Sequence, residues 1–344
     1  MGIFSTGGVG IDLGSANVTI SLQNEGVVLR EPSYVLTRQE DIEEIQAVGR
    51  KAKQMLGRMP GNLYLLSPIR DGAVTDVQTA GALLRGLADK SLGKTRALEK
   101  NRLVISSPVG LTHVEQLALE DTARTTGARR CSLLRSPVAA ALGADIDFSQ
   151  PEGRMVVVIG SSVTEVAVLS MGGIAAARSS RTGSLAFDEA IIRHVRREKG
   201  LIIGQRTAED LKVDLGSARA SVPDQTVTLR GRDAKTGKPG TAQITAKEIA
   251  EAIKRPIEDL LETIREAFEN TPAEMAEDIL RSGVFLSGGG ALLDGLAECL
   301  SKTLNLNVSV GENPQDDVAI GCCMVASDER LAQRCADAGC LIEL

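Results

Sequence analysis

The sequence predicts an α/β protein made of two similar domains that face each other across a cleft. Three observations support this prediction: strand-like apolar runs alternate with amphipathic helical stretches, the chain has 344 residues, and one strand-turn-strand unit occurs twice. Such alternation is typical of sheets covered by helices, and a chain of this length exceeds what one compact core usually holds. A ligand is expected to bind between the two domains.

Strands are expected where short apolar runs are bounded by turn-forming or charged residues. Two helices carry start signals, because Thr112 with Glu115 and Thr245 with Glu248 have the capping-box spacing before amphipathic segments. We expect the second of these helices to bend at Pro256. The seven expected strands are Val9–Leu13, Val18–Leu22, Val27–Leu29, Leu103–Ser106, Met155–Ile159, Glu165–Ser170 and Val284–Ser287.

The repeated unit organises the whole chain. The segment Ile11–Val18 (IDLGSANV) is matched by Val157–Thr164 (VVIGSSVT), and each copy continues into a hairpin, with turns at 24–26 and 171–173. The spacing from residue 12 to residue 26 equals the spacing from 158 to 172. Two copies of one strand-turn-strand unit predict two domains of the same design.

Composition argues against several classes of function. The net charge of −6 argues against general nucleic-acid binding, which needs a surplus of Lys and Arg. The six cysteines have no CxxC spacing, which favours free thiols in a reducing cytosol over a metal site. No apolar run reaches the ~20 residues that span a bilayer. We interpret His113 and His194 as helix-surface residues without a catalytic role.

Glycine-bearing strand ends are the candidate binding elements. An Asp-Leu-Gly strand end followed by small residues lets backbone N–H groups approach a phosphate closely, and Asp12 would hold a hydrated Mg²⁺. Each such loop is also compatible with a plain tight turn. Three of them together favour phosphate binding, since a triple glycine is unfavourable unless something approaches the backbone. The loops comprise Asp12, Gly14, Ser15, Ala16 and Asn17, then Gly160, Ser161 and Ser162, and finally Gly288, Gly289 and Gly290.

Further motifs extend this pattern over most of the chain. They are GIDLG (10–14), EPS (31–33), GRMPGN (57–62), DG (71–72), GQRTAE (204–209) and LSGGGALL (286–293). In this order they resemble the MreB family of bacterial actins over residues 8 to 325. The resemblance implies an actin-like fold, in which two RNase-H-like domains enclose a nucleotide cleft and each domain carries a small inserted subdomain.

Subdomain boundaries follow from the resemblance. We expect subdomain IA at residues 1–35, 69–148 and 318–344, with subdomain IB inserted at 36–68. Subdomain IIA is expected at 149–184 and 249–317, with subdomain IIB inserted at 185–248. The cysteine-bearing tail lies outside the resemblance.

The resemblance also implies the ligand, which is ATP with Mg²⁺. Glu209 and Lys212 are three residues apart, so they share one face of the helix expected over 207–215, as a pocket wall requires. Without the resemblance, a solvated ion pair on a surface helix would be the preferred interpretation of these two residues. The implied adenosine side comprises Ala208, Glu209, Asp210, Leu211 and Lys212 together with Ala291 and Leu292.

Three acidic residues that the family usually carries are replaced here. Ser136 stands where a glutamate orients the attacking water, Val158 where a carboxylate organises the metal, and Leu185 where another acid lies. Phosphoryl transfer depends on such groups, whereas affinity depends more on backbone N–H groups and the adenine pocket. We therefore expect ATP binding with weakened metal dependence and impaired hydrolysis, and assign no catalytic residue. Neutral drift, with Glu165 or Asp188 substituting in part, is the alternative.

The resemblance implies cytoplasmic filaments on the inner face of the membrane, which govern cell shape together with cell-wall elongation proteins and MreB paralogues. Ile3 and Phe4 form a small candidate membrane anchor. Leu98 lies in a basic loop, 90–102, that suits anionic lipid or is simply solvated. Two other functions stay open: a nucleotide-binding scaffold that does not polymerise alone, and a sugar kinase, against which the replaced acids count.

Overall fold

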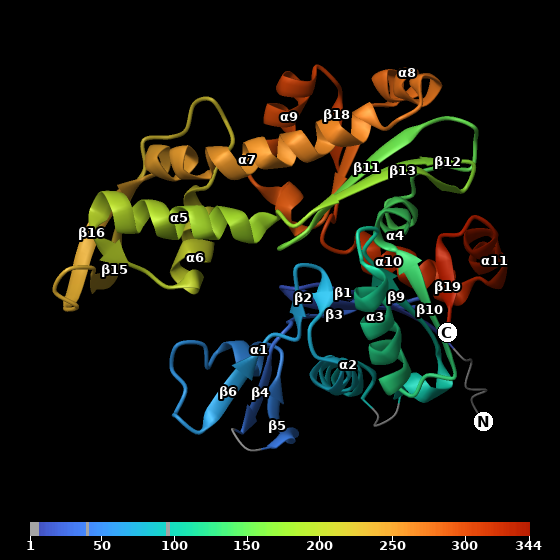
Figure 1. Cartoon of the computed structure of the whole chain (residues 1–344), viewed down its shortest axis with the longest axis horizontal. Coiled ribbons are helices and arrows are strands. Elements are labelled where there is room, and N and C mark those ends of the chain that lie inside the picture. Colours follow the sequence, from blue (N-terminus) through green and yellow to red (C-terminus); the bar gives the residue numbers. More distant parts are fainter. Residues whose placement is uncertain (1–6, 39–40, 94–96) are drawn as a thin grey trace.

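The computed structural model describes residues 7–38, 41–93 and 97–344, and Figure 1 shows the course of the chain. One half of the molecule is built on a six-stranded sheet in the order β19-β10-β9-β1-β2-β3. Its strands are β1 (Gly8–Leu13), β2 (Asn17–Leu22), β3 (Gly26–Pro32), β9 (Arg102–Ser107), β10 (Arg130–Arg135) and β19 (Leu341–Glu343). Its helices are α2 (Val77–Leu92), α3 (His113–Thr125), α4 (Ser136–Gly143), α10 (Asp317–Ser327) and α11 (Glu329–Asp337).

A small sheet in the order β5-β4-β6 is attached to this half and lies beside α2 (Figure 1). It consists of β4 (Val35–Arg38), β5 (Asp41–Val48) and β6 (Leu63–Leu66), with the short helix α1 (Arg50–Lys53) beside it. A two-stranded ribbon, β7 (Ile69–Arg70) and β8 (Ala73–Val74), and a 3-10 turn at Ala97–Lys100 complete this half.

The other half is built on a five-stranded sheet in the order β13-β12-β11-β17-β18. Its strands are β11 (Arg154–Ile159), β12 (Thr164–Ser170), β13 (Gly173–Ser180), β17 (Val284–Ser287) and β18 (Val308–Val310). A small sheet joins β14 (Leu201–Ile202), β15 (Thr226–Asp233) and β16 (Pro239–Thr245). The helices are α5 (Ser184–Lys199), α6 (Gln205–Leu215), α7 (Ala246–Glu269), α8 (Ala273–Ser282) and α9 (Leu296–Leu304), with a 3-10 turn at Gly289–Leu292.

The internal repeat seen in the sequence is a repeat in space. Strands β1, β2 and β3 form an antiparallel meander, and β11, β12 and β13 form the same meander in the other half. The first strand of each meander also pairs in parallel with a later strand, β9 in one half and β17 in the other. The carboxyl ends of β1 and β11 therefore carry equivalent loops.

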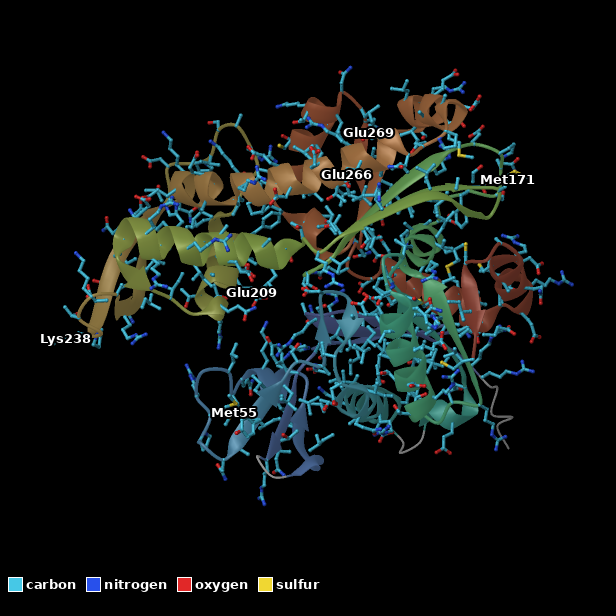
Figure 2. The ribbon with its side chains drawn as sticks, viewed as in Figure 1. Met55, Met171, Glu209, Lys238, Glu266 and Glu269 are labelled. Atoms are coloured by element: carbon cyan, nitrogen blue, oxygen red, sulfur yellow. The ribbon has the colours of Figure 1, made fainter. Side chains whose placement is uncertain are left out.

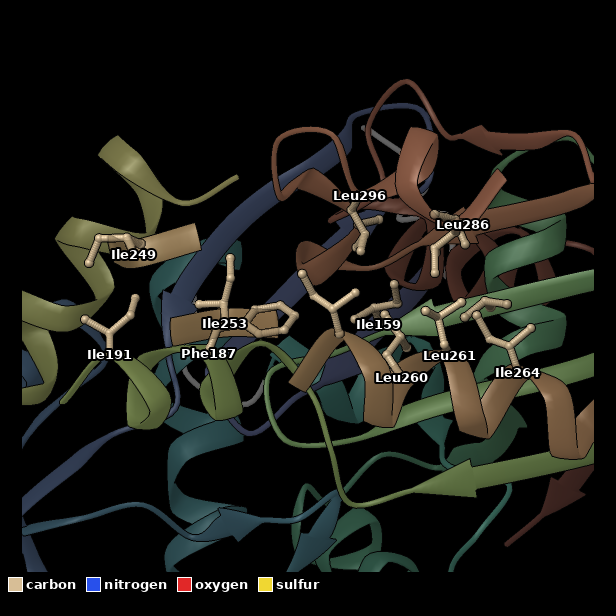
Figure 3. Packing of buried hydrophobic residues seen from close by; sticks show 14 of the residues in the cluster. Ile159, Phe187, Ile191, Ile249, Ile253, Leu260, Leu261, Ile264, Leu286 and Leu296 are labelled. Atoms are coloured by element: carbon tan, nitrogen blue, oxygen red, sulfur yellow. The ribbon is translucent and has the colours of Figure 1, made fainter. Parts of the chain in front are cut away.

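Buried apolar side chains hold the helices against the sheets. On the outer face of the five-stranded sheet, Ile253, Leu260 and Ile264 of α7 pack in one cluster with Ile159 of β11 and Phe187 of α5, as Figure 3 shows. In Figure 3 the labelled side chains of α7 lie among labelled side chains of the sheet strands β11 and β17 and of the helices α5 and α9. Burial at this helical spacing follows from the apolar stripe along the helix.

Helices α4 and α10 lie in a third core that joins the two large sheets. Val138 of α4 and Cys322 of α10 pack in one cluster with Val104 of β9 in one sheet and Val156 of β11 in the other. The contact between the two helices is close, because a Cβ added to Gly321 of α10 would lie 1.9 Å from a backbone oxygen of α4. The pair therefore forms the centre of the molecule.

The described chain agrees with the expected secondary structure. All seven expected strands lie within observed strands, and both capping boxes are formed, at Thr112 before α3 and at Thr245 before α7. Pro256 lies inside the continuous helix α7. Within the described residues, no helix has the length and apolar character needed to cross a membrane.

Two interpretations of side chains were wrong. His194 is only 9% exposed and lies among the buried residues of α5, so it is not a helix-surface residue. Leu98 is 2% exposed and belongs to the core that α2 and α3 share with the six-stranded sheet, so it offers no apolar surface to lipid. Ile3 and Phe4 lie outside the described residues.

Candidate functional site

A cavity of about 480 Å³ lies between the two halves, lined by the loops that follow β1, β11 and β17 and by α6. Its size falls within the range of small-molecule sites, roughly 300–1,000 Å³. Of the residues expected from the sequence, those that line it are Asp12, Gly14, Ser15, Ala16, Asn17, Gly160, Ser161, Ser162, Glu209, Lys212, Gly288, Gly289, Gly290 and Leu292. Residues from distant parts of the sequence are therefore brought to one place.

Four expected residues do not line the cavity. Ala208, Leu211 and Ala291 are buried in the core of the second half, and Asp210 is exposed on α6. The sequence placed these residues correctly along the chain, but a helix presents only one face to a cavity. Among residues 208–212, the side chains that line the cavity are those of Glu209 and Lys212.

The two phosphate-type loops have the same internal geometry. The backbone N–H of Gly14 donates to the carbonyl of Asn17 at 3.0 Å, and that of Gly160 donates to the carbonyl of Val163 at 2.9 Å. At each glycine an added Cβ would lie within 3 Å of the accepting oxygen, at 2.8 Å and 2.9 Å respectively. Glycine is therefore required by the turn itself, and the side of each loop that faces the cavity carries little bulk.

The loops also touch each other across the cavity. The hydroxyl of Ser162 donates to Ser15 Oγ at 2.7 Å, which joins the two halves directly. Beside them the first turn of α5 packs on the second loop, since the N–H of Leu185 donates to the carbonyl of Ser161 at 2.7 Å. The contact between Ser15 and Ser162 thus lies between this cavity and an adjoining one.

Two carboxyl groups face the inner end of the cavity. Asp12 Oδ1 accepts a hydrogen bond from Ser106 Oγ at 2.8 Å, and burial raises the pKa of Asp12 to about 6 despite that bond. Glu165 accepts the backbone N–H of Val109 at 2.7 Å, and burial raises the pKa of its carboxyl to about 7. Both groups are close to titration at neutral pH.

The surroundings of Glu165 predict how stability depends on pH. Its folded-state pKa lies above its ordinary value because of burial and the charge of Asp12, against the N–H of Val109, the hydroxyl of Ser136 and the charge of Arg135. A carboxyl with a raised pKa stabilises the fold at low pH and loses that contribution as pH rises through about 7.

The variant Glu165→Gln cannot ionise. In the ligand-free protein we expect the wild type to lose stability relative to this variant between pH 5 and pH 8, by on the order of 3 kcal/mol. Urea denaturation of both proteins at the two pH values measures the difference. If the wild type and Glu165→Gln differ in free energy of unfolding by the same amount at both pH values, the raised pKa of Glu165 is contradicted.

The donor set fits a cation only in part. Among the described residues, no group of three or more His, Cys, Asp or Glu side chains is arranged to hold a metal ion. Mg²⁺ needs only one or two carboxylates when phosphates and waters supply its other ligands. Asp12, with Glu165 near it, meets that lower requirement. The site therefore fits Mg²⁺ when the cation binds together with a phosphate ligand.

The three positions at which the resemblance implies replaced acids lie at this site or beside it. Ser136, the first residue of α4, and Val158 of β11 both line the cavity, and Val158 stands opposite Glu165 in the sheet register. Leu185 lines an adjoining cavity of about 270 Å³ at the mouth of the cleft. These three positions thus carry a hydroxyl or an aliphatic side chain and no carboxylate.

Charged residues form two ion pairs at the mouth of the cleft, one of which crosses it. Lys53 of α1 pairs with Glu209 of α6 at 3.0 Å, and Lys212 of α6 pairs with Asp188 of α5 at 2.9 Å. Figure 2 shows Glu209 on the side of α6 that faces the segment carrying Met55, which follows α1. The first pair therefore links α1 of one half to α6 of the other.

Several residues of the cavity were not found by sequence reasoning. They come from strand interiors or from loop positions outside the short motifs. A register argument could have found two of them, since Thr19 and Arg30 stand in line with Asp12 across β1, β2 and β3. The lining residues missed include Thr19, Arg30, Ser106, Pro108, Asp294, Pro314 and Gln315.

Two duplicated α/β halves that close on a glycine-lined cavity define the class of actin-like proteins. The solved structure entitled "MamK double helical filament" has the same fold, with a TM-score of 0.76 at 19% identity over 93% of this chain and 98% of that one. Within this class the chain belongs to the MreB/Mbl family, because the family model described as MreB/Mbl protein matches residues 6–334.

Individual relatives agree with this assignment. The cell shape-determining protein Mbl of Bacillus subtilis is 38% identical over 313 residues, which are 91% of this chain and 93% of that protein. The cell shape-determining protein MreB of Escherichia coli is 39% identical over 323 residues, 93% of each chain. MreB5 of Spiroplasma citri bound to AMPPNP superposes with a TM-score of 0.88 at 29% identity, over 96% of this chain and 98% of that one.

Proposed function

We propose that this chain binds ATP in the cleft, assembles into filaments that help to determine cell shape, and hydrolyses ATP slowly or not at all. One observation carries the binding part of the proposal. Three glycine-bearing loops from both halves line one cavity, and Glu209 and Lys212 of α6 line it beside the third loop. Solved structures of Spiroplasma citri MreB5 bound to AMPPNP and to ADP, with TM-scores of 0.88 and 0.87, support the choice of ligand.

The residues of the site support slow hydrolysis. A hydroxyl at Ser136 is far too weak a base to take a proton from the attacking water, and the isopropyl group of Val158 cannot hold a metal-bound water. The backbone groups that would bind the phosphates do not depend on either side chain. Mg²⁺ would add charge neutralisation at the phosphates, held through Asp12.

The family supports a proposal about filament formation and about the place of action. The relatives are cell shape-determining proteins, and we propose filaments on the inner face of the cytoplasmic membrane that work with cell-wall elongation proteins and with MreB paralogues. Burial of Leu98 leaves the segment that contains Ile3 and Phe4 as the candidate anchor.

Two measurements test the proposal. Equilibrium titration with ATP should show binding, while steady-state phosphate release should be at least about 100-fold slower than that of E. coli MreB assayed alongside, as expected when a general base is lost. Phosphate release at the rate of E. coli MreB would overturn the hydrolysis part, and absence of binding would overturn the proposal as a whole.

Filaments are tested separately. Negative-stain electron microscopy of the protein with ATP on a lipid monolayer should show them. Tight ATP binding without filaments would favour the alternative, a scaffold that does not polymerise alone.

The ion pair between Lys53 and Glu209 predicts a kinetic effect. Opening of the mouth requires this contact to break, and a partly exposed pair contributes roughly 0.2–1 kcal/mol. Lys53→Met is therefore expected to speed the release of a fluorescent ATP analogue about 1.4- to 5-fold, as measured by stopped-flow chase. Lys51→Met, on the exposed side of the same helix, is the matched control and should leave the release rate unchanged. Equal rates in both variants and the wild type would rule out this role.

A further inference from the structure

Arg30 occupies an unusual position for a large cation. In the meander of the first half, Asp12 pairs with Thr19, and Thr19 pairs with Arg30, so the three side chains form one row across the sheet. All three line the cavity. Neighbours in such a row are about 5 Å apart, which places the long Arg30 side chain within reach of whatever Asp12 faces.

Contacts hold the guanidinium of Arg30 in this place. Its Nη1 donates to Gln315 Oε1 at 2.7 Å, and its Nη2 donates to Asp316 Oδ1. Gln315 in turn lies beside Gly289 of the third glycine loop, where its Nε2 would be 3.3 Å from an added Cβ. Arg30 therefore stands between the loop that carries Asp12 and the loop that carries Gly289.

The guanidinium keeps unused donors. Arginine has five N–H donors, of which two are accounted for by Gln315 and Asp316. Its Nε is buried and donates to no atom of the described chain. Phosphate oxygens are the acceptors that match such a planar set of donors, and these bonds are short and charge-assisted.

The balance of charge in the cavity points to the same role. Among the described lining residues the basic ones are Arg30 and Lys212, and Lys212 is engaged with Asp188 and with the carbonyl of Ser184. The side chain of Val158 is not a carboxylate and cannot bind a cation. A bound polyphosphate would need positive charge from the protein, and Arg30 is placed to give it.

We propose that Arg30 binds the phosphates of the nucleotide directly and supplies part of the neutralisation that a divalent cation provides in a site richer in carboxylates. The inference rests on the proposed function. It predicts that ATP binding survives removal of Mg²⁺ in the wild type and that this survival depends on Arg30.

The alternative is that Arg30 only ties β3 to the segment before α10 through Asp316. The variants Arg30→Gln and Asp316→Asn separate the two roles, because both break the ion pair but only the first removes the cation. Calorimetric titration of each variant with ATP, ADP and adenosine, in MgCl₂ and in EDTA, gives the comparison.

For Arg30→Gln in EDTA we expect ATP and ADP affinity to fall about 10- to 100-fold, with a loss of only a few-fold in MgCl₂ and none for adenosine. Asp316→Asn should bind ATP as tightly as the wild type or more tightly. Arg30→Lys, which keeps the charge and loses the planar donors, should show a smaller loss in EDTA, and it gives the same comparison if Arg30→Gln does not fold.

Two results would overturn the inference alone: equal losses for Arg30→Gln and Asp316→Asn, or a loss for Arg30→Gln that is as large with adenosine as with ATP. Absence of ATP binding by the wild type in both buffers would overturn the proposed function, and this inference with it. The two failures are therefore distinguishable.

Discussion

Replacing Ser136 by Glu and Val158 by Asp together is expected to raise steady-state phosphate release by about 100-fold or more. The reason is that a correctly placed general base contributes roughly 10²- to 10⁴-fold to such reactions. Both positions line the cavity, Ser136 at the start of α4 and Val158 at the end of β11, so the new carboxylates would face it. A phosphate-release assay with excess ATP and Mg²⁺ measures the effect.

The same double variant should also depend on Mg²⁺ for stability. Position 158 stands opposite Glu165 and beside Ser287 in the sheet register, so a new carboxylate there lies next to an existing buried one. Like charges at this distance repel, and a divalent cation relieves the repulsion. Mg²⁺ with ATP should raise the melting temperature more than in the wild type.

The matched control is Ser136→Gln with Val158→Asn, which has the same shapes without charge and should not hydrolyse ATP faster. A folded Glu and Asp variant with unaltered hydrolysis would mean that these positions are not where the water and the metal lie. That outcome would remove the basis for impaired hydrolysis while leaving the cavity itself in place.

Gly321→Ala is expected to lower the free energy of unfolding by about 2–3 kcal/mol, the range typical of overpacked cores. A Cβ at this position would lie 1.9 Å from the carbonyl oxygen of Ala139, so α4 and α10 would have to separate. The helical preference of alanine over glycine offsets only about 1 kcal/mol of this cost. Chemical denaturation followed by circular dichroism measures the change.

Gly61→Ala serves as the matched control, because a Cβ there meets nothing within 4 Å. It should change the free energy of unfolding by less than about 0.5 kcal/mol. If Gly321→Ala is as stable as Gly61→Ala, then the close packing of the two helices does not contribute to the stability of the fold.

The main features of the fold could be predicted because they are local or repeated. The two strand-turn-strand copies around Asp12 and Val158 fold into equivalent meanders, since the same short pattern meets the same steric limits at Gly14 and Gly160. The glycine loops could be predicted as cavity-lining for the same reason. Phosphate binding by these loops stays a prediction.

What could not be predicted depends on contacts between distant segments. Arg30 and Gln315 are 285 positions apart, and Lys53 and Glu209 are 156 apart, so no sequence window contains either pair. The strand β19, which pairs with β10, uses a three-residue segment too short to stand out by pattern. Leu98 shows the same limit, because a basic neighbourhood in sequence does not reveal which apolar side chain turns inward.

The central position of α4 and α10 has a mechanical consequence. The chain passes between the halves just after α4 and again just before α10, so both covalent connections lie next to one closely packed pair of helices. A rotation of one half relative to the other would therefore have its axis near this pair of helices. Displacement grows with distance from the rotation axis. A rotation too small to disturb Ser136 would therefore produce a much larger displacement at the β15–β16 hairpin near Lys238, which lies far from the centre of the molecule in Figure 2.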